Sequence, residues 1–255
     1  MSLDYSVRGT GEPLVLIHGL FGTRENLGAI ARHLAEAFTV YSVDLLNHGR
    51  SAHRDDLNLP LLAESIHHWM EEVGLDAAHV FGHSLGGKAA MELALSEPER
   101  VKKLIVADIA PVTYENRHVD VFDGLLAIDL QNLQSRAEAD AILQRSVPEK
   151  PVRSFLLKNL QKDADGNFGW RMNLQGLYKS YPELLKQNSI AKFERPVLFL
   201  KAENSDYITV DYREAILSRF PSTDLKVVSN TGHWLHAEKP ELIARLIRKF
   251  IAPDL

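Results

Sequence analysis

A serine between two glycines, placed after a predicted strand and before a predicted helix, is the feature that most constrains this chain. Ala78-His79-Val80-Phe81 is a short apolar run typical of a buried strand, and helix-forming residues run from Gly86 to Ser96. Gly82-His83-Ser84-Leu85-Gly86 joins them as a G-x-S-x-G sequence. A turn this sharp strains the serine backbone and exposes its hydroxyl, while the glycines let strand and helix approach closely. A glycine-rich turn with an incidental serine is the alternative, but the flanking elements favour a nucleophilic Ser84.

Strands and helices alternate along most of the chain. Short apolar runs predict further strands at 14–17, 39–43, 101–108, 197–200 and 225–228, with helical patterns between them. This alternation is typical of an α/β fold with a mostly parallel sheet flanked by helices.

Residues 112–191 interrupt this alternation. They contain helix-like stretches such as 122–130 and 137–145, separated by prolines and glycines, and no strand-like run. We therefore expect a core formed by residues 1–111 and 192–255, with a helical cap inserted at 112–191. Ligands in such sheets bind at the carboxyl ends of the strands, so a cap that begins after the strand ending at Asp108 would cover the site.

The composition excludes several classes of protein. The net charge of −5 leaves no excess of Lys and Arg to neutralise nucleic-acid phosphates. The absence of cysteine excludes disulfides, a cysteine nucleophile and thiolate metal sites. No H-E-x-x-H or P-loop lysine pattern is present, so we expect neither a metal nor a cofactor, and Lys88 is expected to be a packing or surface residue.

We also expect no segment that directs the protein to or through a membrane. No stretch approaches about 18 consecutive apolar residues, the length of a membrane span. Residues 1–5 are not expected to begin a signal peptide, because no basic start precedes a long apolar run. A cytoplasmic protein is therefore expected.

His233 is the strongest candidate for the base that would activate the serine. A serine hydroxyl needs an adjacent base, and the pKa of histidine lies near neutrality. The chain has 11 histidines. His233 follows a glycine after the last predicted strand, which gives the chain order serine, acid, histidine that accompanies this motif. A histidine that merely braces its loop is the alternative.

At these positions the chain resembles the α/β-hydrolase superfamily. His18-Gly19 after an early strand, the segment from Asp44 to Ser51, and Gly232-His233 after the last strand match that pattern in order. A narrower resemblance is to the small bacterial esterases of the YbfF type. The tracts that carry it are His18-Gly19-Leu20-Phe21-Gly22, Gly86-Gly87-Lys88-Ala89-Ala90-Met91, Asp108-Ile109-Ala110-Pro111 and Gly232-His233-Trp234-Leu235-His236-Ala237-Glu238-Lys239-Pro240.

The resemblance implies an oxyanion hole built from backbone amides. The oxyanion of an acyl-transfer transition state needs two preorganised N–H donors. The first is expected to be the amide of Leu85, directly after Ser84, and the second the amide of Leu20, after His18-Gly19.

Two carboxylates compete for the role of the acid that orients the histidine. In many α/β-hydrolases the acid follows the strand after the insert, where this chain has Ser205 at the expected position and Asp206 one residue late. The Asp-Ile-Ala-Pro tract resembles the YbfF-type pattern, which implies that Asp108 is the acid and that Ser205 completes its hydrogen-bond network. We therefore expect Asp108, with Asp206 as the alternative.

The predicted cap is rich in aromatic residues, which form either its own small core or an apolar acyl pocket. Arg117-His118, near the start of the cap, is either a solvated polar turn or a site for an anionic group such as the phosphates of a coenzyme A ester. If the aromatics form a pocket, the residues expected to contact the substrate are Phe21, Tyr114, Trp170, Tyr178 and Trp234.

The sequence thus predicts a serine carboxylesterase that hydrolyses short- to medium-chain acyl esters, as a monomer or homodimer. Acyl thioesters follow the same chemistry. Two alternatives share the scaffold, because one fold hosts many functions. The first is a carbon–carbon bond hydrolase or MenH-like lyase, which needs polar or cationic cap residues facing a dicarbonyl or carboxylate. The second is a ligand receptor with a vestigial triad.

Overall fold

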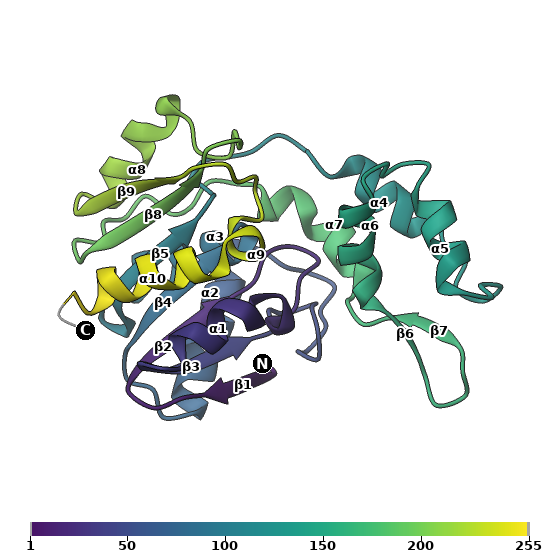
Figure 1. Cartoon of the computed structure of the whole chain (residues 1–255), viewed down its shortest axis with the longest axis horizontal. Coiled ribbons are helices and arrows are strands. Elements are labelled where there is room, and N and C mark those ends of the chain that lie inside the picture. The colour runs from purple at the N-terminus through teal and green to yellow at the C-terminus, as the bar shows by residue number, and fades with distance from the viewer. Residues whose placement is uncertain (1, 254–255) are drawn as a thin grey trace.

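The computed structural model describes residues 2–253 and contains a seven-stranded sheet with the strand order β1-β3-β2-β4-β5-β8-β9 (Figure 1). β1 pairs antiparallel with β3, and the other neighbouring pairs in the sheet are parallel. The mostly parallel sheet is as predicted. Its strands are β1 (Tyr5–Arg8), β2 (Glu12–Ile17), β3 (Phe38–Val43), β4 (Ala78–His83), β5 (Val101–Ala107), β8 (Val197–Ala202) and β9 (Thr223–Val228).

Helices cover both faces of this sheet because the strands are apolar on both sides. Along β2, Val15 and Ile17 face one core cluster while Leu14 and Leu16 face the other. The first cluster is completed by α2 (Leu59–Glu72), α3 (Leu85–Ser96) and α8 (Arg213–Arg219), and the second by α1 (Gly28–Leu34), α9 (Leu235–Glu238) and α10 (Pro240–Ile251).

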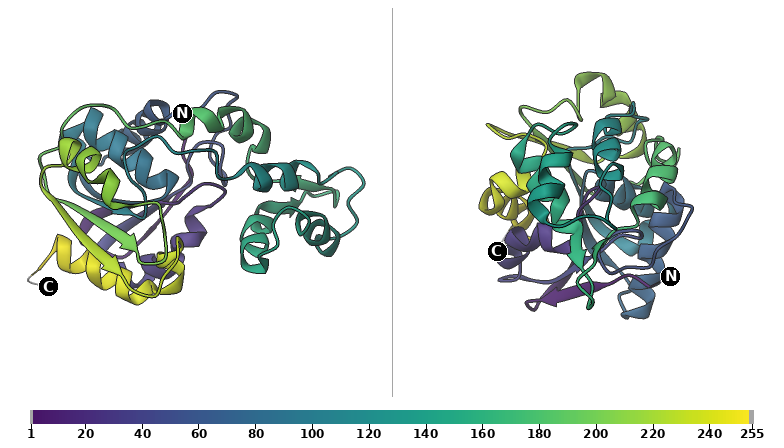
Figure 2. Two further views of the ribbon diagram at one scale, coloured as in Figure 1. Left: turned by 90° about the horizontal axis from the view of Figure 1, so that it is seen from above. Right: turned by 90° about the vertical axis from the view of Figure 1, so that its right-hand side faces the viewer.

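Between β5 and β8 the chain forms a second lobe, which we call the cap. Figure 2 shows it extending away from the sheet, with α7 returning toward the core. The cap contains α4 (Val119–Leu126), α5 (Arg136–Leu143), α6 (Lys150–Leu156), β6 (Leu160–Lys162), β7 (Phe168–Trp170) and α7 (Leu174–Leu184).

The hairpin β6–β7 corrects the expectation that this segment contains helices alone. Its two strands pair antiparallel over three residues each, which is too short for an alternating pattern to show in the sequence. The turn between them is held by the Asp163 carboxylate, which accepts hydrogen bonds from the backbone N–H groups of Asp165 and Asn167. Gly166 supplies the positive φ of 87° that the turn requires.

The turn from β4 to α3 has the geometry that the glycine spacing predicts. Ser84 has φ 53° and ψ −120°, a conformation that non-glycine residues seldom adopt. A Cβ atom on Gly86 would lie 2.4 Å from the carbonyl oxygens of both Ile17 and His18, and one on Gly82 would lie 2.2 Å from the carbonyl oxygen of Gly86. The close approach of strand, turn and helix therefore depends on these two glycines.

We expect Gly86→Ala to destabilise the fold. The added methyl group meets two backbone oxygens that cannot rotate away, and overpacking of this kind costs about 1–3 kcal/mol. Gly28→Ala is the matched control, because nothing lies within 4 Å of its Cβ position at the start of α1. Thermal melts should show Gly86→Ala several degrees below the wild-type protein, at roughly 2–4 °C per kcal/mol for a domain of this size. Equal melting temperatures for the two variants would contradict this account.

Candidate active site

The ends of β4 and β5 bring Ser84 and Asp108 to neighbouring positions on the sheet. His83 pairs with Ala107 in the parallel register, and the Ser84 N–H donates to the Ala107 carbonyl oxygen at 3.0 Å. The Asp108 N–H donates to the carbonyl oxygen of Leu200 in β8 at 2.8 Å. Asp108, like Ser84, has a positive φ, at 51°. Both side chains therefore leave the sheet at its carboxyl edge, on adjacent strands.

Asp108 contacts the two partners that the YbfF-type pattern implies. Its Oδ2 accepts hydrogen bonds from His233 Nδ1 at 2.8 Å and from the Ser205 hydroxyl at 2.5 Å. Its Oδ1 accepts from the backbone N–H of Ala202 at 2.9 Å. The carboxylate is fully buried and fully occupied. Because His233 Nδ1 carries the proton of this hydrogen bond, Nε2 of the same ring holds the lone pair.

The Ser84 hydroxyl and the His233 ring form no hydrogen bond within residues 2–253. Serine–histidine hydrogen bonds are often long in proteins without substrate and tighten in the complex.

Asp206, the alternative acid, pairs with a different residue. Its carboxylate accepts a hydrogen bond from Arg117 Nη1 at 2.5 Å, and its side chain is 71% exposed. The hydrogen bond from Arg117 holds the pKa of Asp206 below its usual value. The position one residue after Ser205 thus directs this side chain toward the cap.

Tyr207 stacks on the His233 ring, a contact that sequence reasoning missed. The two ring centroids are 4.0 Å apart and the rings are inclined by 21°. The Arg117 guanidinium lies 4.9 Å from the Tyr207 centroid, and the Tyr114 hydroxyl donates to the Tyr207 carbonyl oxygen at 2.5 Å. The only sequence signal for this contact is that Tyr207 directly follows Ser205 and Asp206, two residues near the expected position of the acid.

Two buried histidines, His83 and His236, pack beside the loop that carries His233. His83 Nε2 donates to the His233 carbonyl oxygen at 2.8 Å, and its ring centroid lies 4.8 Å from that of His233 and 4.2 Å from that of His236. Burial lowers the pKa of His236 to about 3 and that of His83 well below its usual value. Both rings are therefore neutral at physiological pH.

The loop after β2 lies directly beside the turn that carries Ser84. A Cβ atom on Gly19 would lie 3.2 Å from Ser84 Cβ. His48 Nε2 accepts from the Phe21 N–H at 3.2 Å, so the Phe21 amide is engaged. Within the described chain, the N–H groups of Leu20 and Leu85 have no protein acceptor, and both residues line the same cavity as Ser84.

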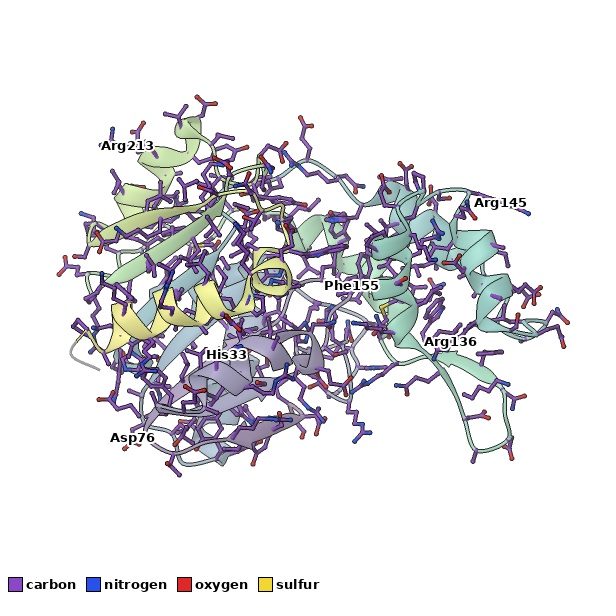
Figure 3. The ribbon with its side chains drawn as sticks, in the orientation of Figure 1. His33, Asp76, Arg136, Arg145, Phe155 and Arg213 are labelled. Atoms are coloured by element: carbon purple, nitrogen blue, oxygen red, sulfur yellow. The ribbon has the colours of Figure 1, made fainter. Side chains whose placement is uncertain are left out.

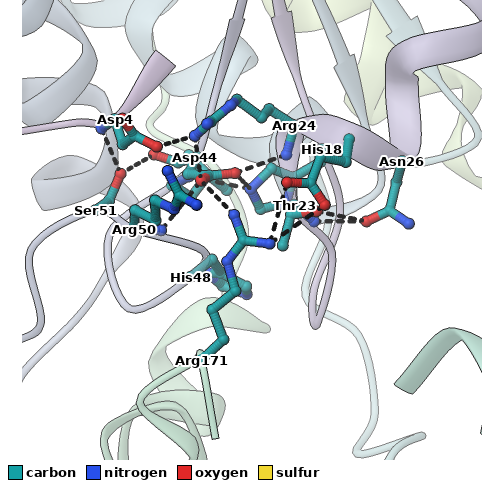
Figure 4. Close-up of polar contacts among 12 residues, drawn as sticks. Asp4, His18, Thr23, Arg24, Asn26, Asp44, His48, Arg50, Ser51 and Arg171 are labelled. Atoms are coloured by element: carbon teal, nitrogen blue, oxygen red, sulfur yellow. Dashed lines mark hydrogen bonds and ion pairs between the residues drawn. The ribbon is translucent and has the colours of Figure 1, made fainter. Parts of the chain in front are cut away.

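A buried carboxylate holds this loop against the next one (Figure 4). Asp44 accepts hydrogen bonds from the backbone N–H of Arg24 at 2.7 Å, from Arg24 Nη1 at 2.9 Å and from the Arg50 N–H at 3.1 Å. Burial alone would raise the pKa of Asp44, but His18 and these donors outweigh it and lower that pKa. Arg171, from the cap, reaches within 3.8 Å of the same carboxylate.

The cavity beside Ser84 is small and mostly apolar, with a volume of about 40 Å³. Lys88, in its wall, is 3% exposed, which corrects the expectation of a surface residue and leaves the packing role. Its Nζ donates to the carbonyl oxygens of Val112 at 2.7 Å and Lys186 at 2.5 Å, and burial lowers its pKa to about 7. The cavity is lined by Leu20, Ser84, Leu85, Lys88, Ile109, Tyr114, Arg117, His118, Tyr181, Leu184, Leu185 and Tyr207.

Of the five aromatic residues expected to contact substrate, Tyr114 lines this cavity. The other four are not among the described residues that line it. Phe21 packs on Phe122, Trp170 lines a separate hollow of the cap, and Tyr178 is 48% exposed. Trp234 packs against Phe155, which Figure 3 labels on the side of the cap facing the core. The structure thus places these four in the cap and its junction with the core.

Outside this site, His67, His68 and Glu71 on α2 are the one group in the described chain whose ligand atoms lie close enough to hold a metal ion. Glu71 already pairs with Arg100 at 2.9 Å, and the three residues are half-buried or exposed. Among residues 2–253, no helix is long and apolar enough to cross a membrane.

The buried neutral histidines predict a loss of stability in acid. Their folded-state pKa values, about 3 for His48 and His236, lie below the unfolded value near 6.5, so the unfolded chain binds more protons as the pH falls. The free energy of unfolding should therefore fall from about pH 6.5 toward pH 3, by about 1.4 kcal/mol per pH unit for each histidine. Denaturant melts of His236→Gln should show a shallower fall than the wild-type protein. The exposed His53→Gln is the control, and a slope unchanged by His236→Gln would contradict the account.

Comparison with known proteins identifies the family of this chain. The family model for the alpha/beta hydrolase fold matches residues 12–240. Esterase YbfF of Escherichia coli (strain K12) is 38% identical over 240 residues, which cover 94% of this chain and 92% of that protein. The sn-1-specific diacylglycerol lipase ABHD11 of Danio rerio is 33% identical over 266 residues, which cover 99% of this chain and 83% of that protein.

Among solved structures, a marine microorganism esterase superposes with a TM-score of 0.94 at 36% sequence identity, covering 97% of this chain and 98% of that one. Sequence, sheet topology and the match over residues 12–240 together establish that the chain belongs to the alpha/beta hydrolase family and resembles the YbfF-type esterases.

Proposed function

We propose that this chain is a serine carboxylesterase that cleaves short- to medium-chain acyl esters through an acyl-enzyme intermediate. The observation that carries the proposal is the hydrogen bond between Asp108 and His233 at the edge of the sheet where Ser84 stands on the neighbouring strand. Relatives named as esterases and as a diacylglycerol lipase support ester hydrolysis as the reaction class.

In the first half of the reaction, the Ser84 hydroxyl attacks the acyl carbon while His233 Nε2 takes its proton. Asp108 stabilises the imidazolium that forms, because its carboxylate already accepts the Nδ1 proton at 2.8 Å. The N–H groups of Leu20 and Leu85, which have no acceptor in the described chain, would bind the developing oxyanion. The alcohol then leaves with the proton that His233 holds.

In the second half, a water molecule attacks the acyl carbon of the acyl-enzyme while it gives a proton to the same histidine. The histidine returns that proton to the Ser84 oxygen as the acid leaves. The small apolar cavity supports a short acyl chain, and a longer chain would require the cap side chains around it to move. An acyl thioester would react by the same steps.

The partners of Arg117 and Lys88 near Ser84 favour ester hydrolysis over the first alternative, a carbon–carbon bond hydrolase or lyase. Arg117 is paired with Asp206, and the Lys88 amine is surrounded by backbone carbonyl oxygens. Neither is free to bind the carboxylate or dicarbonyl group that a lyase or carbon–carbon bond hydrolase must hold. The second alternative, a receptor with a vestigial triad, is tested by whether the protein hydrolyses esters at all.

The first test is covalent labelling of the nucleophile. A fluorophosphonate should add one adduct, which mass spectrometry should locate on the peptide that contains Ser84. Hydrolysis of nitrophenyl esters should disappear in Ser84→Ala. An adduct elsewhere, or full activity in the variant, would refute the assignment, and absence of turnover in the wild-type protein would favour a receptor.

The second test separates the two candidate acids. Asp108→Asn should lower kcat by roughly 10³ to 10⁴-fold, because the histidine loses its orienting carboxylate. Asp206→Asn should cost far less, because its carboxylate faces Arg117. Ser205→Ala removes one hydrogen bond to a charged group, which is worth about 1.5–3 kcal/mol. It should therefore lower kcat by about 10 to 150-fold.

All three variants should be assayed on one ester after circular dichroism has shown an intact fold. If Asp206→Asn is inactive while Asp108→Asn keeps near wild-type kcat, the acid is Asp206.

A further inference from the structure

A histidine–tyrosine pair lies in the wall of the Ser84 cavity and has no part in the proposed acyl transfer. His118 precedes α4 at the start of the cap, and Tyr181 lies in α7. His118 Nδ1 and the Tyr181 hydroxyl are 2.5 Å apart, and both residues line the cavity beside Ser84. The Phe21 ring packs edge-on against His118 with centroids 6.2 Å apart. The imidazole is thus fixed from two sides.

The surroundings of this pair determine which nitrogen of His118 carries the proton. Within residues 2–253, His118 Nδ1 is the only hydrogen-bond partner of the Tyr181 hydroxyl, so the phenol hydrogen is directed at Nδ1. Nδ1 is then an acceptor, and the ring proton sits on Nε2. Burial, with smaller effects from His233 and Arg117, lowers the pKa of His118 to about 4, so the ring is neutral at physiological pH.

The other polar side chains that the cap brings to this cavity already have internal partners. Arg117 pairs with Asp206, and the Tyr114 hydroxyl donates to the Tyr207 carbonyl oxygen and accepts from the Ala110 N–H. His118 Nε2, by contrast, has no hydrogen-bond partner in residues 2–253. The cap therefore offers the substrate an uncharged N–H donor, whereas the Arg117 guanidinium is paired with Asp206.

We propose that His118 is a specificity-determining residue whose Nε2–H donates a hydrogen bond to an uncharged oxygen in the acyl chain of the substrate. The preferred substrates are then esters of oxygenated acids, with an ether, hydroxyl or second carbonyl oxygen along the chain. A hydrocarbon chain in the same place would leave the N–H without an acceptor, and sites built around a hydrogen bond discriminate strongly against such analogues. This proposal rests on the esterase function proposed above.

The test uses nitrophenyl hexanoate and three analogues in which an ether oxygen replaces the methylene at position 3, 4 or 5. Each kcat/KM is divided by the rate of hydroxide hydrolysis, which removes the effect of the oxygen on ester reactivity. For the wild-type protein, at least one oxygen position should raise this ratio about 10-fold or more over hexanoate. His118→Phe, which keeps a ring but has no donor, should lower kcat/KM on the preferred oxygenated ester about 10-fold more than on hexanoate, and so abolish that preference.

Two further variants give the test a graded response. His118→Gln keeps an N–H donor and should recover part of the preference if His118→Phe folds poorly. Tyr181→Phe removes the hydroxyl that holds the proton of His118 on Nε2. It should therefore reduce the preference without abolishing it. Tyr178→Phe is the matched control on the same helix, because Tyr178 is 48% exposed and does not line the cavity.

Equal losses on hexanoate and on every oxygenated ester in His118→Phe would overturn the assignment. So would a preference that disappears in Tyr207→Phe but survives in His118→Phe. Absence of turnover of all four esters by the wild-type protein, equal to Ser84→Ala, would refute the esterase function and this proposal with it.

Discussion

The parallel register between β4 and β5 is the constraint on which the site depends. It places His83 opposite Ala107, so that the next residue on each strand, Ser84 and Asp108, stands at the same edge of the sheet. Both residues adopt positive φ values, and each donates its backbone N–H to the neighbouring strand. The two strained turns therefore take part in the backbone hydrogen bonding of the sheet. The packing of the sheet offsets the free-energy cost of their conformation.

The cap completes the site with contacts that a core alone would lack. Asn159 donates to the Phe21 carbonyl oxygen at 2.7 Å, which fixes the loop beside Ser84 from the cap side. Arg117 lies over Tyr207, which in turn stacks on His233. Residues of both the cap and the core thus orient the His233 imidazole.

Sequence reasoning predicted the elements with strong local signals and missed those without them. The buried strands and the turn at Ser84 are visible because continuous apolar runs and glycine spacing are local patterns. β1 lacks such a pattern because its residues are mostly exposed. The Tyr207 stack, the His83 hydrogen bond and the position of Lys88 depend on chain segments brought together by folding, so no local pattern could reveal them. Asp108 was favoured over Asp206 by resemblance, since spacing alone left both open.

The Lys88 amine also bears on how this scaffold accommodates inserts. The Lys88 Nζ atom donates hydrogen bonds to two backbone carbonyl oxygens. One belongs to Val112, where the chain enters the cap, and the other to Lys186, where the chain leaves it. The two ends of the insert are therefore held side by side on α3, the helix that follows Ser84. The entropy of closing a loop grows only slowly with its length. Contacts that hold the two ends of the insert together thus allow the segment between them to change in length while the sheet stays the same.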